Sequence, residues 1–336
     1  MTARDVDAMR ALASRMLRSG TPGTLSTLFA ARGSTYRPLG SMMVGFPGRH
    51  AGGVSGGCLE EHIARVGERE TRSVPAAMLH FSTHPDSEDN TPLLGCGSSI
   101  DVLVERLTAG HLAFLEEFGA AVERDEGSLL ACRARRYGAS LSVTREWLRS
   151  ADGHTETASD QDVLLHYVPP LTRLVIFGAG DDARPVCEIG ASLGWHVSVA
   201  DRRARYATSA RFPHARRVLA CDWDDALESI RFSPRTAVVL MTHSLDDDAR
   251  VLSRLSGRRL AYVGVLGPVH RRERLLEEAS AFGMASRDPV ARMLRGPIGL
   301  DLGDKSPVGI AVAVTAEILA HFNRRPAMSL HAHVAA

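Results

Sequence analysis

Two of the five cysteines in this 336-residue chain lie in glycine-rich segments whose residue types suit chemistry. Cys58 follows Gly56 and Gly57 in GGVSGGCLEEHI, and Cys96 stands between two glycines in LLGCGSSIDV. Glycines let the backbone approach a ligand closely, and a thiolate serves both as a nucleophile and as a ligand for soft metals. Both cysteines are therefore candidate catalytic residues and metal ligands, and Gly56 and Gly57 are candidate cofactor contacts. The alternative is that each thiol only fills space in the core.

The residues after Cys58 have helical spacing, with Leu59, Ile63 and Val66 on one face. This spacing predicts that Cys58 opens a helix and that Glu60 lies off the apolar face. At a helix N-terminus the dipole lowers the pKa of a thiol, whereas neighbouring carboxylates oppose that effect. The remaining cysteines lie in apolar or helical patterns and are expected in the core: Cys132, Cys187 and Cys221.

The segment LVIFGAGDDARP contains a glycine turn typical of dinucleotide-binding sheets. Gly178, Gly180 and Ala183 form G-x-G-x-x-A between an apolar strand and a helix, where free N–H groups favour an anion. Asp201 follows Gly180 by 21 residues, at the position where an acid binds a ribose hydroxyl. Arg202 is the alternative ligand, for a 2′-phosphate. A tight turn without any ligand is the other interpretation.

Two further predicted strands end near the same crevice. Thr242 and His243 follow one of them, and Gly264 and Gly267 lie in YVGVLG at the end of the next. Ligands of parallel sheets bind outside the carboxyl ends of the strands. We therefore include these four residues among the candidate cofactor contacts, although a single histidine is often structural.

The elements that position the cysteines belong to an α+β domain predicted over residues 1–147. Helical spacing over 5–18 and 111–123 alternates with short apolar runs, and the order is not a strict strand–helix repeat. The strands are expected at 24–31, 41–46, 76–81, 99–107, 128–134 and 139–144.

A linker is predicted over residues 148–170, because RSADGHTETASDQD is polar and a Pro-Pro pair closes the stretch. Strands and helices then alternate over 171–325, which predicts a Rossmann-like, doubly wound parallel sheet. Ser306 and Pro307 are expected to start its last helix. Residues 326–336 are expected to form a flexible tail. The predicted fold class is thus α/β, with an N-terminal α+β domain before the Rossmann-like domain.

Composition excludes several classes of protein. The formal net charge of +1 gives no field that attracts nucleic acid or an anionic membrane. No run approaches the roughly 18 apolar residues that span a bilayer, and the first residues lack the apolar core of a signal peptide. The scattered cysteines form no disulfide framework or CxxC pair, so we expect a cytoplasmic protein without a zinc site.

Taken together, these segments resemble the XdhC/CoxI family, whose members are accessory factors of molybdenum hydroxylases such as xanthine dehydrogenase. The likeness covers about residues 23–322 and keeps the motifs in order. Ser98, Pro268 and Gly309 depart from it, because the family usually has glycine, serine and glutamate there. The segments that carry it are RGSTYRPLGSMMV, GGVSGGCLEEHI, GCGSSIDVLVE, LVIFGAGDDARP, VLMTHS, YVGVLG and RGPIGLDLGDKSPVGIAVAVTAEILA.

The resemblance implies a cofactor chaperone more than a turnover enzyme. Such proteins bind the molybdenum cofactor (molybdopterin or a dinucleotide form), protect it while a cysteine desulfurase supplies its sulfido ligand, and deliver it to the hydroxylase apoenzyme. On this basis Cys58 or Cys96 ligates molybdenum or relays sulfur, and the turn at Gly178 and Gly180 holds the phosphate. We also expect a homodimer.

Two other classes of function remain open at this stage. An NAD(P)-dependent oxidoreductase would account for the glycine turn, but the sequence shows no convincing Tyr-x-x-x-Lys pair for hydride transfer. A scaffold that only recruits the desulfurase and the hydroxylase would leave the crevice empty.

Overall fold

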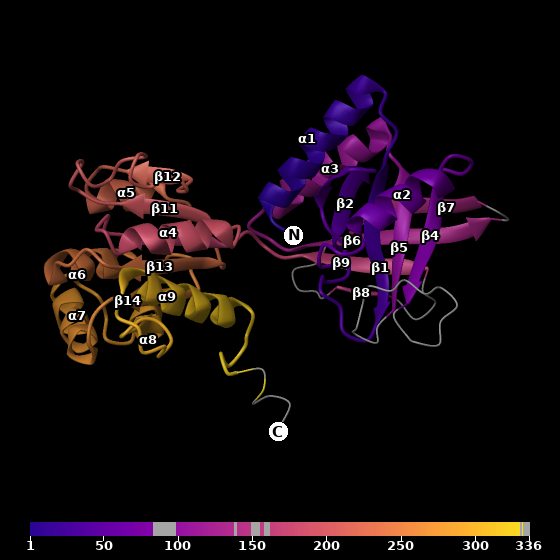
Figure 1. Ribbon diagram of the computed structural model, residues 1–336. Helices are drawn as coiled ribbons and strands as arrows, with labels where there is room; N and C mark the ends of the chain where they lie inside the picture. Colours follow the sequence, from indigo (N-terminus) through magenta and orange to yellow (C-terminus); the bar gives the residue numbers. More distant parts are fainter. Residues whose placement is uncertain (83–98, 138–139, 149–154, 158–161, 330, 332–336) are drawn as a thin grey trace. The chain divides into compact units, whose positions relative to one another are not determined.

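The computed structural model describes residues 1–82, 99–137, 140–148, 155–157, 162–329 and 331. Contacts within the chain divide it into an N-terminal unit, Met1–Pro170, and a C-terminal unit, Leu171–Ala336 (Figure 1). Each unit has its own sheets and helices.

A five-stranded antiparallel sheet forms the centre of the N-terminal unit, in the order β3-β2-β1-β5-β4. Four of these strands lie where the apolar runs predict them. The edge strand β3 was not predicted, because its four residues are exposed or half-buried and show no apolar alternation. The strands are β1 (Thr24–Arg32), β2 (Met42–Phe46), β3 (Arg49–Gly52), β4 (Ala76–Ser82) and β5 (Ser99–Arg106).

A second sheet of the same unit has the order β7-β6-β9-β8. Its strands are β6 (Ser128–Tyr137), β7 (Ser140–Leu148), β8 (Glu156–Thr157) and β9 (Val163–Val168). The predicted linker over 148–170 is therefore wrong for residues 163–168, which pair with β6. The physical reason is burial: Leu164 and Val168 are 1% and 3% exposed, because the pairing with β6 brings both side chains into the core.

Three helices cover the first sheet: α1 (Ala3–Ser19), α2 (Glu60–Glu70) and α3 (Ala109–Val122). Side chains of a strand alternate between its faces, so β1 contributes to more than one core. Leu28 packs in a cluster with Ile63 of α2. Leu25 instead packs with α1 and α3, which lie together in Figure 1. Phe29 packs with Leu164 of the second sheet. The glycine-rich segment before α2 is thus attached to a well-packed layer.

A buried ion cluster joins β5, α3 and β7, which carry Glu105, His111 and Arg145. Glu105 of β5 is 5% exposed, and its carboxylate accepts hydrogen bonds from Arg145 Nη1 at 3.1 Å and from His111 Nε2 at 3.3 Å. The Arg145 guanidinium lies 4.6 Å from the centroid of the Phe114 ring. Burial alone would raise the pKa of Glu105, but the bonds from His111 and Arg145 lower it to about 2.

The C-terminal unit is built on a six-stranded parallel sheet in the order β12-β11-β10-β13-β14-β15. In chain order this is 3-2-1-4-5-6, the arrangement of dinucleotide-binding sheets, and the direction reverses between β10 and β13. The strands are β10 (Arg173–Phe177), β11 (His196–Ala200), β12 (Arg217–Leu219), β13 (Thr236–Leu240), β14 (Tyr262–Val265) and β15 (Leu294–Arg295).

Helices cover both faces of this sheet, which confirms the predicted α/β fold class with a Rossmann domain. One core contains α4 (Ala183–Ser192) and α9 (Pro307–Phe322), and Ser306 caps α9 as predicted. The other core contains α5 (Trp223–Ser229), α6 (Leu245–Arg254), α7 (Val269–Ala281) and α8 (Pro289–Met293). Over the ranges that the structure describes, no helix has the length and apolar character needed to cross a membrane.

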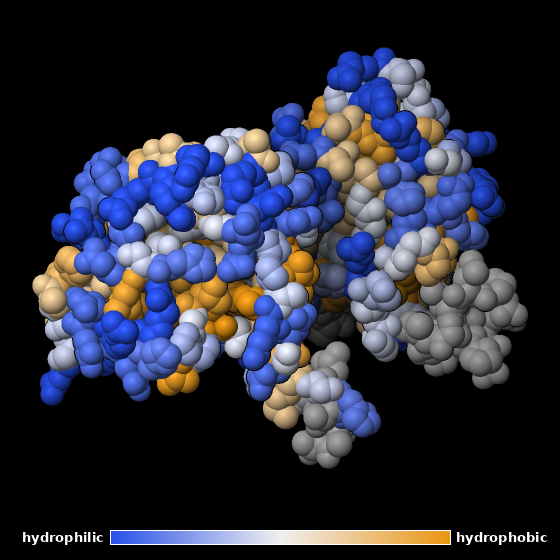
Figure 2. Space-filling view, turned by 60° about the vertical axis from the view of Figure 1, so that its left-hand side comes forward, coloured by the Kyte–Doolittle hydropathy of each residue, from blue (hydrophilic) through white to orange (hydrophobic). Residues whose placement is uncertain are grey.

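Hydrophilic side chains cover much of the visible surface, and apolar side chains show between them (Figure 2). On α9, Val308, Val312 and Leu319 are exposed. The opposite side of α9 is anchored by Glu317, whose carboxylate accepts hydrogen bonds from Tyr262 Oη at 2.9 Å and from Gly299 N at 2.6 Å. The last helix is therefore fixed to the sheet while its outer face remains partly apolar.

The ion cluster predicts how the N-terminal unit responds to mutation. Glu105→Ala leaves the Arg145 charge buried without its partner, which should destabilise this unit by about 3–5 kcal/mol. Hydrogen exchange of the β1 and β5 amides measures this separately from the other unit. The matched control is Glu146→Ala, because Glu146 pairs with Arg133 but is 63% exposed. Equal exchange in the two variants would contradict the prediction.

The same carboxyl predicts an acid response. Its folded pKa of about 2 lies below the ordinary value of 4.5, so its contribution to stability is present above pH 4.5 and is lost as the pH falls towards 2. Glu105→Gln removes the titrating group, so the free energy of unfolding of this unit should fall less steeply with acid in the variant. Hydrogen exchange measured between these pH values checks this, and parallel profiles would count against it.

Candidate functional site

Cys58 lies on an exposed loop between β3 and α2. The helix begins at Glu60, so the prediction that Cys58 opens it is wrong by two residues, and the thiol stands before the first turn. Cys132 and Cys187 are buried, as predicted, and desolvation raises the pKa of each to about 11, whereas Cys221, also expected in the core, is only half-buried. Cys58 is thus the exposed thiol among the cysteines in the described residues.

The loop takes its conformation from the buried carboxylate of Glu60. This group accepts hydrogen bonds from Val54 N at 3.1 Å, from Ser55 N at 2.8 Å and from Ser55 Oγ at 2.6 Å. Burial raises the pKa of Glu60, but the bonds from Ser55 and Val54 outweigh it, and the net pKa lies below the ordinary value. The sequence pattern does not reveal this role, because it places Glu60 off the apolar face and no local motif links Glu60 to Ser55 across two glycines.

The Ser55 hydroxyl completes the turn towards Cys58. Its oxygen accepts hydrogen bonds from Gly57 N and Leu59 N, both at 3.3 Å, and lies 3.7 Å from Cys58 Sγ. Gly57 has a φ of 105°, which favours glycine. These contacts fix the backbone on both sides of Cys58 while the thiol remains exposed.

A neighbouring loop, residues 33–40, is attached to this segment. Arg37 Nε donates a hydrogen bond to the carbonyl oxygen of Ser55 at 3.3 Å. Cys96, the second predicted cysteine, lies outside the described residues, so its position relative to Cys58 stays a prediction. Within the described ranges, no group of three or more His, Cys, Asp or Glu side chains is arranged to hold a metal ion.

In the C-terminal unit, the predicted glycine turn lies against the residues that follow β13. Gly178 has a φ of 109°, and a Cβ there would lie 2.3 Å from the carbonyl oxygen of Met241. A Cβ on Gly180 would lie 3.3 Å from His243 Nε2. The structure therefore brings Gly178, Gly180, Thr242 and His243 together at the point where the strand order reverses. The positions of the predicted strand ends in the sequence already indicate this grouping.

Asp201 and Arg202, predicted to contact a ribose or its phosphate, are both engaged by the protein itself. The Asp201 carboxylate, 2% exposed, accepts hydrogen bonds from Ala179 N at 2.7 Å and from Arg203 Nη2 at 2.7 Å. Arg202 Nη2 lies 2.7 Å from the carboxylate of Asp247. Asp201 thus holds the glycine turn in place, and Arg202 forms an ion pair with Asp247 in the first turn of α6.

Thr242 and His243 differ in what they contribute. Thr242 Oγ1 donates to the fully buried Asp248 at 2.7 Å, and Arg271 Nη2 lies 2.7 Å from the same carboxylate. Burial raises the pKa of Asp248, against the opposing effects of Thr242 and Arg271. His243 has a φ of 64°, a conformation rare outside glycine, and Nε2 lies 3.9 Å from Asp182 Oδ2. Its exposed imidazole faces the glycine turn.

The two remaining predicted glycines have packing contacts. Gly264 is buried within β14, where a Cβ would lie 2.3 Å from Ile298 Cδ1. Gly267 has a φ of 137°, and a Cβ there would lie 2.4 Å from Arg271 Cδ. Glycine is required at 264 by the fit of Ile298 and at 267 by the positive φ, whether or not a ligand also binds near them.

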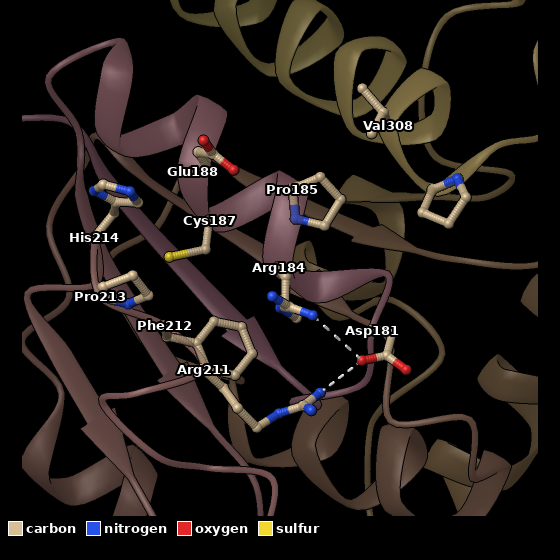
Figure 3. Close-up of a pocket in the computed structure, with 11 residues that line it drawn as sticks. Asp181, Arg184, Pro185, Cys187, Glu188, Arg211, Phe212, Pro213, His214 and Val308 are labelled. Carbon is tan, nitrogen blue, oxygen red and sulfur yellow. Dashed lines mark hydrogen bonds and ion pairs between the residues drawn. The ribbon is translucent and has the colours of Figure 1, made fainter.

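A groove of about 300 Å³ lies beside the glycine turn (Figure 3). Its walls come from α4, from the segment 211–214 and from the start of α9. Asp181 lies at one end of the groove, and its carboxylate is 2.9 Å from Arg211 Nη2 and 4.0 Å from Arg184 Nη1. These surface ion pairs place positive charge beside one of the two acids that follow Gly180 in the turn.

Two family models match the chain, one in each unit. The model described as the XdhC and CoxI family matches residues 16–81, which include the Cys58 loop, and the XdhC Rossmann domain matches residues 174–318. The chain belongs to the XdhC and CoxI family. The resemblance seen in the sequence is thereby confirmed.

Relatives of known description match most of the chain. A Bacillus subtilis protein described as a probable xanthine dehydrogenase subunit is 29% identical over 90% of this chain and 94% of its own length. The Escherichia coli molybdenum cofactor insertion chaperone PaoD is 23% identical over 90% of this chain and 84% of its own length. A crystal structure described as a xanthine dehydrogenase from Bacillus halodurans superposes on this chain with a TM-score of 0.76 at 23% identity. The match covers 97% of this chain and 99% of the other chain, and it shows that the two share a fold.

Glu60 offers a test of how the Cys58 loop is held. Glu60→Ala leaves two buried N–H groups without an acceptor, which should destabilise the N-terminal unit by on the order of 2–3 kcal/mol. The rate at which Cys58 reacts with a thiol reagent, read by peptide mass spectrometry, should change as the loop loosens. The control is Glu61→Ala. The exposed Glu61 carboxylate accepts a hydrogen bond from Gly48 N at 2.9 Å, outside the Cys58 loop. This variant should leave both the stability and the labelling rate nearly unchanged. An unaltered labelling rate in Glu60→Ala would refute the role given to this carboxylate.

Proposed function

We propose that this protein is a molybdenum cofactor insertion factor. It receives the cofactor, protects it while the terminal sulfido ligand is installed, and delivers it to the apoenzyme of a xanthine-dehydrogenase-type hydroxylase. The observation that carries the proposal is the exposed Cys58 thiol, held on a fixed loop within the segment that the XdhC and CoxI model matches. The descriptions of two relatives, a cofactor insertion chaperone and a probable part of a xanthine dehydrogenase, support it.

The donor set suits a metal that arrives with its own ligands. A bare metal ion needs several protein ligands, and the described residues provide no such cluster. Molybdenum in its cofactor is already held by a dithiolene, so one soft thiolate from the protein is enough to contact it. We assign this contact to Cys58, together with Cys96, either as a metal ligand or as the carrier of the sulfur atom.

The phosphate end of the cargo is assigned to the glycine turn of the C-terminal unit. Gly178 and Gly180 open the backbone there, and the N-terminus of α4 favours an anion. Arg211 and Arg184 lie near Asp181 and supply positive charge beside the turn, which partly offsets the repulsion between that acid and a phosphate and so supports this assignment. Thr242 and His243 are proposed to border the same position.

An NAD(P)-dependent oxidoreductase is the second candidate, favoured by the strand order of the C-terminal sheet. Two contacts weigh against it. Asp201 is buried and bonded to Ala179 and Arg203, so it is not offered to a ribose, and Arg202 is already paired with Asp247 through Nη2, which competes with a 2′-phosphate.

The partners we propose are the hydroxylase apoenzyme and a cysteine desulfurase, and the functional form is a homodimer in the cytoplasm, where thiols stay reduced. Light scattering on the purified chain tests the dimer. Co-purification with the desulfurase, with and without Cys58→Ala, tests the sulfur-supplying partner.

The proposal predicts a bound pterin. The full chain is purified from molybdate-replete cells and oxidised, and the fluorescent pterin derivative is measured per chain. Wild type should carry it, and Cys58→Ala should carry at least about tenfold less, since one metal–thiolate contact is lost. Cys96→Ala tests the second predicted cysteine.

Cys221→Ala is the control for this measurement, because Cys221 is a half-buried thiol in the other unit. Tight NAD(P) binding without any pterin would overturn the proposal. If Cys58→Ala and Cys96→Ala both carried as much pterin as wild type, the two thiols would have no part in the mechanism, and the carrier role would remain.

A further inference from the structure

Tyr36 is the most exposed large apolar side chain in the described ranges, at 87%. It lies on the loop 33–40, beside the Cys58 segment. Single exposed aromatic side chains are ordinary on protein surfaces, so exposure alone decides nothing. The contact that holds the ring is what distinguishes this tyrosine.

One face of the Tyr36 ring rests on the backbone of Gly56. A Cβ built on Gly56 would lie 3.2 Å from Cγ, 3.3 Å from Cδ1 and 3.4 Å from Cδ2 of the ring. Nearly equal distances to these three atoms place that Cβ over the face of the ring rather than at its edge. With one face on Gly56 and 87% of the residue exposed, the other face is open to solvent.

The loop that carries Tyr36 is tied to the loop that carries Cys58. Arg37 donates to the Ser55 carbonyl oxygen, and Ser55 in turn is held by the buried Glu60. The open ring face and the exposed thiol therefore belong to one fixed pair of loops, and Gly56 is two residues from Cys58. The two loops are thus tied to each other before a ligand arrives, which reduces the entropy lost on binding.

We propose that Tyr36 is the stacking platform for the planar pterin ring of the cofactor, beside the thiol that contacts its metal end. This inference rests on the proposed function and adds the residue that recognises the organic part of the cargo. Fused heteroaromatic rings stack on tyrosine, and the loss of such a contact weakens binding roughly tenfold.

The test uses full-length chains purified from molybdate-replete cells, with the oxidised pterin measured per chain before and after timed gel filtration. Tyr36→Ala should retain about tenfold less pterin than wild type. Tyr36→Phe keeps the ring and should retain the wild-type amount. Tyr137→Ala is the matched control, because Tyr137 is a 65% exposed tyrosine in β6 of the same unit, and it should also retain the wild-type amount.

Each other outcome decides against the inference. Wild-type retention by Tyr36→Ala, alongside loss in Cys58→Ala, would overturn the stacking role and leave the proposed function standing. Loss in Tyr36→Phe equal to that in Tyr36→Ala would assign the effect to the hydroxyl and not to the ring face. A wild-type chain without pterin would overturn the proposed function, and this inference with it. Thermal unfolding of Tyr36→Ala should match wild type, since the side chain contributes almost no buried area.

Discussion

Buried carboxylates that accept hydrogen bonds from loop N–H groups fix the functional segments of this protein. A buried N–H group needs an acceptor, and a loop has no helix or strand partner to supply one. Glu60 provides it for Val54 and Ser55 in the N-terminal unit. Asp201 does the same for Ala179 in the C-terminal unit. Although the folds of the two units differ, the same interaction positions the candidate site in each.

This use of carboxylates changes how the C-terminal crevice is interpreted. In a dinucleotide-binding sheet the acid after the second strand is offered to the ribose. Here Asp201 is almost fully buried and bonded to the turn itself, and Arg203 covers it. The glycine turn therefore keeps its shape without a ligand. The strand topology is that of a nucleotide-binding domain, while the groups that would select a particular nucleotide are engaged elsewhere.

The sequence predicts the parts of the fold that depend on local periodicity. β1 and α9 follow from apolar spacing and from the Ser306 cap, and the glycine turn follows from its position between strand and helix. The strand β9 was missed, because it follows a long polar stretch; only Leu164 and Val168 of its six residues are fully buried, and their burial depends on the pairing with β6. Glu60 was missed for a similar reason: its partners are reached through a turn of two glycines, and no periodic pattern encodes that contact. Tertiary contacts, which periodicity does not contain, decide both cases.

If the protein carries the cofactor as proposed, an exposed thiol on a fixed loop meets two opposite requirements. Binding is favoured when the loop is ordered in advance, and Glu60 and Ser55 provide that order. Release requires that the metal end remain accessible to the next protein and that few bonds break at once. In the proposed function, one surface thiolate and one aromatic ring face would hold the cofactor through few contacts, and the dissociation rate would then be high enough for transfer to an acceptor. A buried site with several ligands would hold the cargo more tightly and for that reason would transfer it less readily.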